Sequence, residues 1–283
     1  MSKQQGEWTT VITSKRPIFR LNLKEVWEYF DLIMLFVRRD FVTQFKQTIL
    51  GPLWFFIQPL MTTGMFVVVF GKIAKIPTDN IPPPLFYMSG IVFWNFFSGS
   101  LTKTSNVFVS NANIMKKVYF PRLTIPISTL ITGMMRMAIQ LTLFFIILFY
   151  YFMRGAPVEI NAYALLLPFL IIHIALLGLA VGLIISSLTT KYRDLSFLVQ
   201  FGMQLWMYAT PIVYPLSQVP EKWRFYYSFN PVVPMLELFK KGFLGAGSAD
   251  WMMWGISFIV TLVLLFVGII VFNAIERTFI DTV

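Results

Sequence analysis

Residues 191–247 read KYRDLSFLVQFGMQLWMYATPIVYPLSQVPEKWRFYYSFNPVVPMLELFKKGFLGAG, and this stretch departs from the pattern of an ordinary membrane span. The chain is uncharged from Leu195 to Pro220, which is enough for one crossing because about 20 helical residues suffice. A charged, aromatic segment follows, and then a half-length apolar stretch, 232–244. Such a stretch fits an interfacial or re-entrant helix, and non-helical backbone at membrane depth must be covered by protein or line a cavity. We therefore expect short re-entrant helices in 221–247, with a surface loop and a lipid-bound amphipathic helix as the alternative.

The composition predicts a helical membrane protein. The chain is 57% hydrophobic, 17% aromatic and 13% charged, and its apolar residues are clustered. It contains no cysteine, which excludes disulfides and cysteine metal sites. The net charge of +10 could indicate nucleic-acid binding, but basic residues that flank membrane spans explain it better, so we expect no nucleic-acid partner.

Six segments are long and uncharged enough to be predicted as crossings. Together they predict an all-α polytopic fold whose six-helix transmembrane domain covers 51–275. They are Gly51–Gly71, Ile81–Thr102, parts of 123–153, 160–190 and 195–213, and Trp251–Ile275.

The N-terminal 47 residues divide into two predicted parts. Residues 1–22 are polar and basic and predict a cytosolic tail, whereas 23–47 carry apolar residues at spacings of three and four, which indicates one face of a helix. The charged residues fall largely elsewhere, so we expect an amphipathic helix in the membrane interface. The apolar face consists of Trp27, Phe30, Met34, Val37, Phe41 and Phe45.

The distribution of basic residues predicts the orientation. With a cytosolic N-terminus, the inner segments hold 15 of the 23 lysines and arginines and the outer segments hold seven, with Arg136 left uncounted. This excess obeys the positive-inside rule. We therefore expect both termini, including 276–283, in the cytosol and the 221–247 segment on the outer side.

The sequence contains no recognisable catalytic motif. The sequence lacks a G-x-x-x-x-G-K-[ST] phosphate loop, its outward carboxylates are scattered, and it has no metal-ligand motif. The single histidine, His173, has no neighbouring acid in sequence and is expected to be a bundle-facing polar residue. We predict no catalytic residues, no metal site and no cofactor in this chain.

Arg136 is the unusual charge within the third apolar segment. Because Met137–Met153 can span alone, Arg136 is expected at the cytosolic boundary, where it would snorkel. The alternative is that it meets an anionic lipid head group inside the bundle, because intramembrane charge is costly and usually functional.

Polar and aromatic residues form stripes on three predicted spans. Such stripes either line an aqueous path or join helices by hydrogen bonds, and three stripes with aromatic rings favour a shared lining because rings pack on sugar faces while amides bond hydroxyls. The predicted lining residues are Trp54, Gln58, Thr62, Tyr87, Trp94, Ser98, Gln200, Gln204 and Tyr208.

Several motifs together resemble a known family. QTILGPLW at 47–54, running on to QPL at 58–60, resembles the entry to the first span of ABC-2-type polysaccharide exporters. NANIMKKVYFPR at 111–122 is similar to the cytosolic turn after their second span, and YRD at 192–194, TPIVYP at 210–215 and Asn230-Pro231 match a third diagnostic region. The likeness is greatest to the membrane subunit of O-antigen exporters, with teichoic-acid and capsule exporters as near relatives. Arg136 departs from this pattern.

The resemblance implies partners and a substrate. It implies a homodimer in the bacterial inner membrane, paired with two copies of a separate ATPase that binds ATP and Mg²⁺. The complex would move an undecaprenyl-diphosphate-linked polysaccharide outwards. In that family the interfacial helix and the turn after the second span dock on the ATPase, the first, second and fifth spans line the channel, and the segment after the fifth forms gate helices.

The resemblance carries two further sets of site residues. The ATPase-coupling residues are Asn113, Lys116, Lys117, Tyr119 and Phe120, and the gate residues are Tyr227, Asn230, Pro231 and Glu237. The competing hypotheses are an ABC-2 exporter of small hydrophobic drugs, which would need no aromatic and amide lining, and a membrane enzyme acting on lipid-linked sugar, which lacks a catalytic constellation.

Overall fold

The computed structural model describes residues 23–192 and 194–282, so the predicted tail 1–22 and Arg193 of the YRD motif lie outside the described residues. The described residues form helices and no strand, as the predicted all-α class requires. The elements are α1 (Leu23–Glu28), α2 (Phe30–Thr43), η1 (Gly51–Leu53), α3 (Trp54–Phe66), η2 (Val67–Ile73), α4 (Pro83–Ser105), α5 (Val107–Met115), α6 (Thr124–Met153), η3 (Ala162–Leu166), α7 (Leu167–Lys191), α8 (Leu195–Tyr208), η4 (Leu216–Gln218), α9 (Glu221–Tyr227), α10 (Val233–Leu244) and α11 (Trp251–Thr282).

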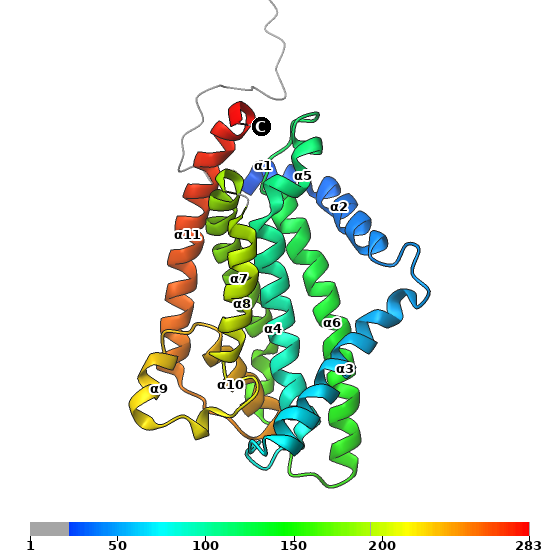
Figure 1. Ribbon diagram of the computed structural model, residues 1–283, viewed down its shortest axis with the longest axis vertical. Coiled ribbons are helices and arrows are strands. Elements are labelled where there is room, and N and C mark those ends of the chain that lie inside the picture. The colour runs from blue at the N-terminus through cyan, green and yellow to red at the C-terminus, as the bar shows by residue number, and fades with distance from the viewer. Residues whose placement is uncertain (1–22, 193, 283) are drawn as a thin grey trace, which may run out of the picture.

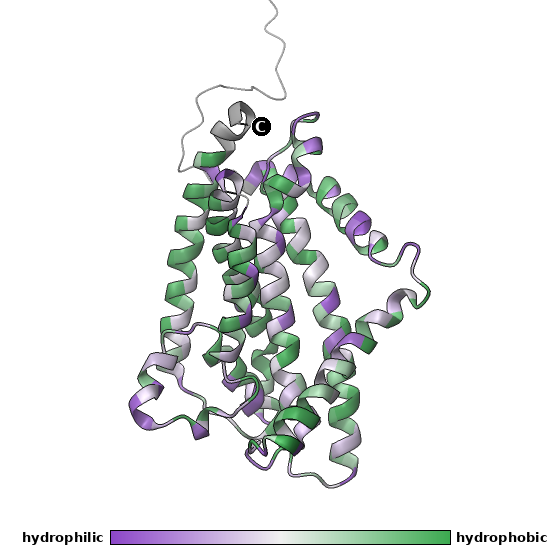
Figure 2. Ribbon diagram, viewed as in Figure 1, coloured by the Kyte–Doolittle hydropathy of each residue, from purple (hydrophilic) through white to green (hydrophobic). Residues whose placement is uncertain are grey.

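Four helical segments in the described residues are long and apolar enough to cross a membrane. They are Gly51–Ile73, Thr124–Met153, Ala162–Lys191 and Trp251–Ile275. Two other predicted crossings are helical but do not meet this measure. Helix α8 has 14 residues, about 21 Å of helix, which is less than the roughly 30 Å of hydrocarbon. Helix α4 has sufficient length, but it is less hydrophobic than α7 and α11, as its paler colour in Figure 2 shows. The count of six crossings therefore stays a prediction.

The lower hydropathy of α4 has a structural reason, because α4 is the central helix of the bundle. It contacts α3, α6, α7, α8 and α10, and most of its residues are buried. A helix surrounded by protein does not need a lipid-like surface. Glycines on its neighbours allow a close approach: a Cβ at Gly182 of α7 would lie 2.6 Å from Cβ of Thr104, and one at Gly133 of α6 would lie 3.0 Å from the Phe96 ring.

The long helices run between two ends of the molecule (Figure 1). Helices α1 and α5 and the end of α11 lie at one end, and α9, α10 and the loop between η2 and α4 lie at the other. This arrangement places the basic turn after α5 and the aromatic segment 221–231 at opposite ends, as the predicted topology requires.

The predicted helix 23–47 is two helices, α1 and α2, followed by turns. Their protein-facing side consists of Val26, Ile33, Phe36 and Val37, and three of these pack on Leu123, Ile127 and Ile131 at the start of α6. Of the predicted apolar face only Val37 is fully buried. Trp27, Phe30 and Met34 are exposed, so the predicted face points away from the bundle and leaves an apolar surface of the kind that interfacial helices place in lipid.

The half-length helix α10 is enclosed by protein. All its residues except Lys241 are buried, and Phe239 packs on Phe93 and Phe144 at ring-centroid distances of 4.8 and 5.1 Å. A helix lying on the lipid surface would keep one face exposed, so the surface alternative does not fit α10. Helix α9, in contrast, is exposed on the outside of this end of the molecule.

Candidate translocation surface, gate segment and coupling face

Helix α8 is held loosely against the bundle by one side. Met203 is its one buried residue, and Trp206 is half-buried against Phe97 and Trp94 at ring-centroid distances of 5.1 and 6.4 Å. Beside this packed side, Gln200, Gln204 and Tyr208 are exposed and follow one another at intervals of four residues. We call these three residues the α8 stripe.

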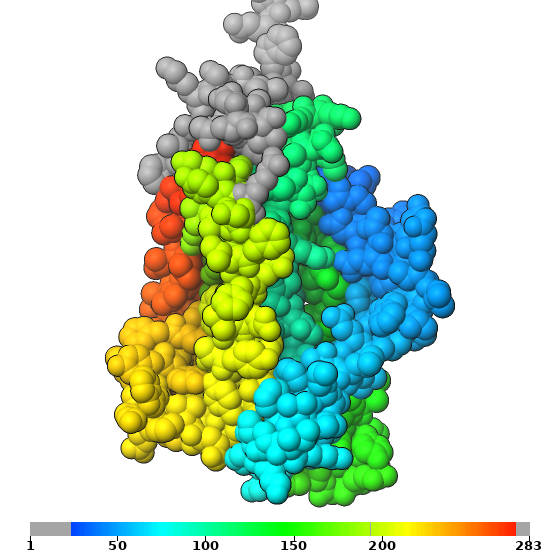
Figure 3. Space-filling view, viewed as in Figure 1, coloured from blue at the N-terminus to red at the C-terminus, as the bar shows by residue number. Residues whose placement is uncertain are grey.

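The predicted lining residues of α4 lie in two environments. Tyr87 is fully buried among the rings of Phe66, Phe70 and Phe86, and Trp94 is 6% exposed. Ser98, in contrast, is half-buried and lines a cavity. A narrow strip of α4 stays open between α3 and α8 (Figure 3). The positions of Tyr87 and Trp94 favour packing within the protomer, whereas Ser98 is open to a passing ligand.

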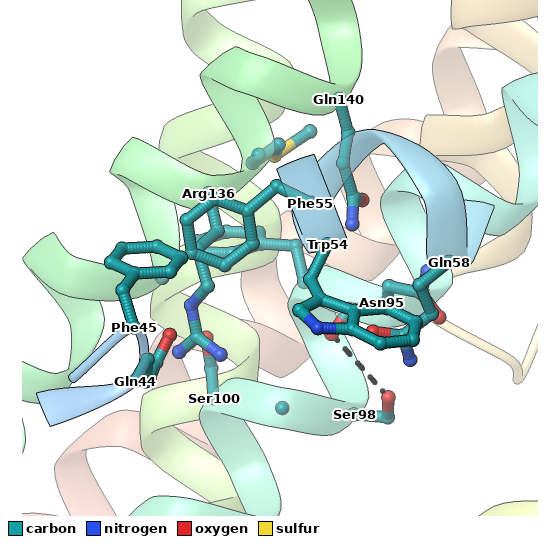
Figure 4. Close-up of a pocket in the computed structure, with 14 residues that line it drawn as sticks. Gln44, Phe45, Trp54, Phe55, Gln58, Asn95, Ser98, Ser100, Arg136 and Gln140 are labelled. Carbon is teal, nitrogen blue, oxygen red and sulfur yellow. Dashed lines mark hydrogen bonds between the residues drawn. The ribbon is translucent and has the colours of Figure 1, made fainter. Parts of the chain in front are cut away.

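The predicted lining residues of α3 lie beside this strip. Trp54 and Gln58 are exposed, and Thr62 is half-buried with its hydroxyl bonded to the Gln58 carbonyl at 3.0 Å. Trp54, Gln58 and Ser98 line one cavity of about 410 Å³ between α3, α4 and α6, called here the α6 cavity (Figure 4). The structure thus brings three of the nine predicted lining residues together, and the α8 stripe lies on the other side of α4.

The gate segment, residues 221–247, is joined to α8 by the side chain of Asn230. Its Oδ1 accepts hydrogen bonds from Trp206 Nε1 at 3.1 Å and from the Val232 amide at 3.2 Å, and its Nδ2 donates to Thr210 Oγ1 at 2.9 Å. The neighbouring Pro231 is buried, and its carbonyl accepts a hydrogen bond of 2.7 Å from Ser257 of α11.

A pair of tyrosines adds a second link between the two segments. The hydroxyls of Tyr214 and Tyr227 lie 2.6 Å apart. Of the predicted gate residues, Tyr227 and Asn230 therefore both hold the gate segment on the end of α8.

Glu237 lies within a buried polar cluster of α10. Its Oε1 is 3.6 Å from Lys240 Nζ, and its Oε2 accepts a hydrogen bond of 3.1 Å from the Ser248 amide. Lys240 Nζ also donates to the Pro211 carbonyl at 2.8 Å and lies 4.3 Å from the centroid of the Phe86 ring. Burial lowers the pKa of Lys240, and the Glu237 carboxylate opposes that shift. The cluster connects α10 with the loop after α8 and with the turn at Gly247.

The coupling face lies at the other end of the molecule, on the turn after α5. Asn113, Lys116, Lys117 and Tyr119 are exposed, whereas Phe120 is 4% exposed. The Tyr119 hydroxyl donates a hydrogen bond of 3.1 Å to Glu25 of α1, and the Phe120 ring packs edge-on against Phe36 of α2 at 5.8 Å. The turn and the amphipathic helices therefore form one continuous surface.

Other polar residues join helices. His173 is buried, and its Nε2 lies 3.0 Å from Thr261 Oγ1 and 3.4 Å from Ser257 Oγ of α11. This confirms that His173 faces the bundle. Within the described residues no group of three or more His, Asp or Glu side chains is arranged to hold a metal ion.

Sequence reasoning missed several residues of these sites. Thr210 and Lys240 hold the gate segment, and Gln140 lines the α6 cavity. Gln140 follows Arg136 by four residues, so its helical spacing could have found it. Lys240 had no such signal. Lys240 and Lys241 are adjacent and look alike in the sequence, but only Lys240 is buried in the structure.

Comparison with known proteins assigns a family to this arrangement. The model of the ABC-2 type transporter family matches residues 31–244. An O-antigen export system permease protein, RfbA, of Klebsiella pneumoniae is 27% identical over 250 residues, which cover 88% of this chain and 94% of that protein. RfbA of Myxococcus xanthus is 26% identical over 71% of this chain and 74% of its own length. The polysialic acid transport protein KpsM of Escherichia coli is 22% identical over 84% of this chain and 91% of its own length. The chain belongs to the ABC-2 type transporter family of membrane proteins.

Proposed function

We propose that this chain is the membrane subunit of an ATP-driven exporter of a lipid-linked polysaccharide of the O-antigen type. It works as a homodimer with two copies of a separate ATPase in the cytoplasmic membrane of a bacterium. The relatives named above are O-antigen export permease proteins and a polysialic acid transport protein, which supports a polysaccharide as the substrate class.

The α8 stripe is the observation that carries the proposal. Gln200, Gln204 and Tyr208 are exposed on the surface of their own protomer, on a helix whose other exposed residues are largely apolar. An amide that enters hydrocarbon without a hydrogen-bond partner costs roughly 2–7 kcal/mol, so this face is not expected to contact lipid tails. It requires a second protomer, a water-filled conduit, or both.

The chemistry of the open residues suits a sliding glycan. Tyr208 and Trp54 expose aromatic faces, and Gln58, Gln200 and Gln204 expose amides. Aromatic rings pack against the apolar faces of sugars, and amides exchange hydrogen bonds with hydroxyls and water, so no single contact holds the polymer. In the proposed dimer the open strip of α4, with α3 and α8 beside it, forms one wall of the conduit.

The proposed topology has six crossings with α1, α5 and the end of α11 on the cytosolic side. Helix α4 crosses as the protein-enclosed centre, and α8 completes its crossing with the non-helical residues that follow it. Helices α9 and α10 then form a re-entrant gate on the outer side, and the burial of α10 supports this because its backbone is shielded from lipid. Helices α1 and α2 lie in the cytosolic interface.

The coupling face supplies the contact with the ATPase in this proposal. Two contacts allow force on the turn after α5 to be transmitted to α2 and the start of α6. They are the hydrogen bond of Tyr119 to Glu25 and the packing of Phe120 on Phe36. The exposed Lys116 and Lys117 offer positive charge to an acidic partner surface.

A paired substitution on α8 tests the proposal. Replacing Gln200 and Gln204 with Leu removes both amides, and replacing the exposed Leu198 and Leu205 with Ala changes the apolar residues of the same helix. We expect the first pair to reduce polysaccharide export strongly while dimer formation and ATPase activity persist, and the control pair to have little effect on export. Normal export with both amides removed would refute the assignment of this face to the conduit.

A further inference from the structure

The α6 cavity contains a cation, Arg136, that forms no ion pair among the described residues. The cavity lies between the end of α2 and helices α3, α4 and α6, and its volume of about 410 Å³ is in the range of small-molecule sites. The side chain of Arg136 projects from α6 into it, with the guanidinium directed towards Gln44 and Ser100 (Figure 4).

Arg136 has little local compensation. Its one hydrogen bond among the described residues runs from Nε to the Thr132 carbonyl at 3.5 Å, the outer limit for such a bond. No carboxylate oxygen in the part of the chain that the structure describes lies within 4.0 Å of the Arg136 guanidinium. A guanidinium has five N–H donors, so most of its hydrogen-bonding capacity is open to a ligand.

The neighbouring charges leave an excess of positive charge. Asp40 attracts Arg136, but its carboxylate already binds Arg39 at 2.7 Å. Lys103 on α4 is close enough to repel Arg136 electrostatically. Arg39, Lys103 and Arg136 therefore share the attraction of one carboxylate, Asp40, and an anion in the cavity would relieve the repulsion between Lys103 and Arg136.

Uncharged donors also line the cavity without partners. Ser100 is 3% exposed, and its buried hydroxyl has no hydrogen-bond partner in the described structure. It faces α6 one turn before Arg136, because a Cβ at Gly133 would lie 3.4 Å from its oxygen. The amides of Gln44 and Gln140 line the same space, and each can donate hydrogen bonds to an anion.

The depth of the cavity indicates which anion reaches it. Arg136 follows Thr124, the first residue of α6, by 12 positions, which is about 18 Å of helix. At this level Gln44, Phe45 and Trp54 mark the passage of the chain from the amphipathic helix α2 to α3. An interfacial helix marks the boundary between head groups and acyl chains, where the anions are lipid phosphates.

We propose that the α6 cavity binds the phosphate or diphosphate group of a membrane lipid, with Arg136 as the cationic anchor and Ser100 as a buried donor. Arginine suits this role because its planar donor fork matches phosphate oxygens. The proposal uses the proposed function only to place the cavity in the cytosolic leaflet. Both an anionic phospholipid and a polyprenyl diphosphate carry the required group.

Binding to the full chain in dodecyl maltoside micelles, which contain no phosphate, tests the proposal. The probes are farnesyl diphosphate, phosphatidylglycerol, farnesol and inorganic pyrophosphate, and the Kd is taken from ligand-induced thermal stabilisation. The variants are Arg136→Gln, Arg136→Lys and Ser100→Ala. Arg38→Gln is the matched control, because Arg38 is an exposed arginine on α2 that does not line the cavity.

We expect Arg136→Gln to weaken binding of a phosphorylated lipid about tenfold or more, a change of about 1.4 kcal/mol. Arg136→Lys should weaken it less, because one charge remains but the fork is lost. Arg38→Gln should bind as the wild type does. The more tightly bound of the two phosphorylated lipids identifies the source of the phosphate.

Three results would overturn the proposal: equal binding by the Arg136→Gln and Arg38→Gln variants, equal binding of farnesol and farnesyl diphosphate, or binding of pyrophosphate as tight as that of either lipid. If Arg136→Gln does not fold, the Arg136→Lys and Ser100→Ala variants provide the test. Unchanged affinity of both variants for the phosphorylated lipids would overturn the proposal. The assay contains no ATP or glycan, so its failure is distinct from a failure of export by the α8 variants.

Discussion

The indole Nε1 of Trp206 donates a hydrogen bond of 3.1 Å to Oδ1 of Asn230, and this bond joins α8 to the gate segment. The same amide holds Thr210 at the end of α8 through its Nδ2. Trp206 in turn packs on Trp94 and Phe97 of α4. A displacement of α8 relative to α4 would therefore move the residues at the start of α10. Asn230 is thus the joint, that is, the mechanical link between the proposed conduit and its gate.

Replacing Asn230 with Ala is expected to lower both stability and export. The change removes all three hydrogen bonds of the Asn230 side chain and leaves the half-buried Trp206 Nε1 without its acceptor, which costs about 1–3 kcal/mol. Thermal unfolding of the purified protein measures the loss. Ser228→Ala, two residues earlier and also half-buried, is the control and should change neither property. Wild-type stability of Asn230→Ala would show that the joint is not formed.

The buried pair Glu237 and Lys240 should behave as one unit. Replacing Glu237 with Gln or Lys240 with Met leaves the other charge buried without its counterion, and such a loss typically costs about 3–5 kcal/mol. The double variant should be more stable than the sum of the two losses predicts. A double-mutant cycle on unfolding temperatures measures this coupling, and simple additivity would contradict the pairing.

Cysteine labelling tests the proposed outer gate, because the chain has no cysteine of its own. Phe225 and Phe229 are exposed by about two-thirds, whereas Leu236 is fully buried. Single cysteines at 225 and 229 should react with a membrane-impermeant reagent from outside only, and one at 236 should not react in the resting state. Reaction of 225 or 229 from the cytosolic side would refute the orientation.

The sequence predicted where the helices lie along the chain better than it predicted which residues they pack against. Apolar runs located the four segments that are long enough to cross a membrane, the helices α4 and α8, and the half-length α10, because helix formation depends on local sequence and apolar content. The apolar face of 23–47 was harder to interpret. Spacing identified Trp27, Phe30 and Met34 as one face, but both lipid and protein accept apolar residues, and the protein-facing side proved to be Val26, Ile33, Phe36 and Val37.

The same ambiguity affected α4. Tyr87 and Trp94 share a helical face with Ser98, yet rings from α3, α4 and α8 enclose the first two, and contacts between distant segments are not encoded in the spacing along one helix. Asn230 could be singled out through the resemblance, but its bonds to Trp206 and Thr210 required the structure.

Two neighbouring residues of the coupling face are expected to have different roles, Tyr119 in transmitting force and Phe120 in stabilising the fold. Val118 and Tyr119 are exposed neighbours on the turn, and Phe120 is buried against Phe36. Tyr119→Ala should leave the fold intact but lower the export obtained per ATP hydrolysed, because the link to Glu25 is lost. Phe120→Ala should instead destabilise the protein, by about 3–5 kcal/mol as is typical of a buried ring.

The measurements for this prediction are export and ATPase rate in the same vesicles, together with unfolding temperature. Val118→Ala serves as the exposed control and should behave as the wild type does. If Tyr119→Ala keeps its full ratio of export to hydrolysis, the turn does not transmit force through the bond to Glu25.

The proposed lining is tested by comparing Trp94→Ala with Tyr208→Ala. Trp94 is 6% exposed and packed between Phe97 and Trp206, so its removal leaves a cavity and is expected to cost about 3–5 kcal/mol. Tyr208 is 46% exposed on the α8 stripe, so its removal should change stability by less than about 1 kcal/mol while it impairs export. Unfolding temperature, dimer formation and export are measured on both variants. The opposite order, with Tyr208→Ala losing assembly first and Trp94→Ala exporting poorly at wild-type stability, would mean that α8 joins protomers through this face and that the polymer passes elsewhere.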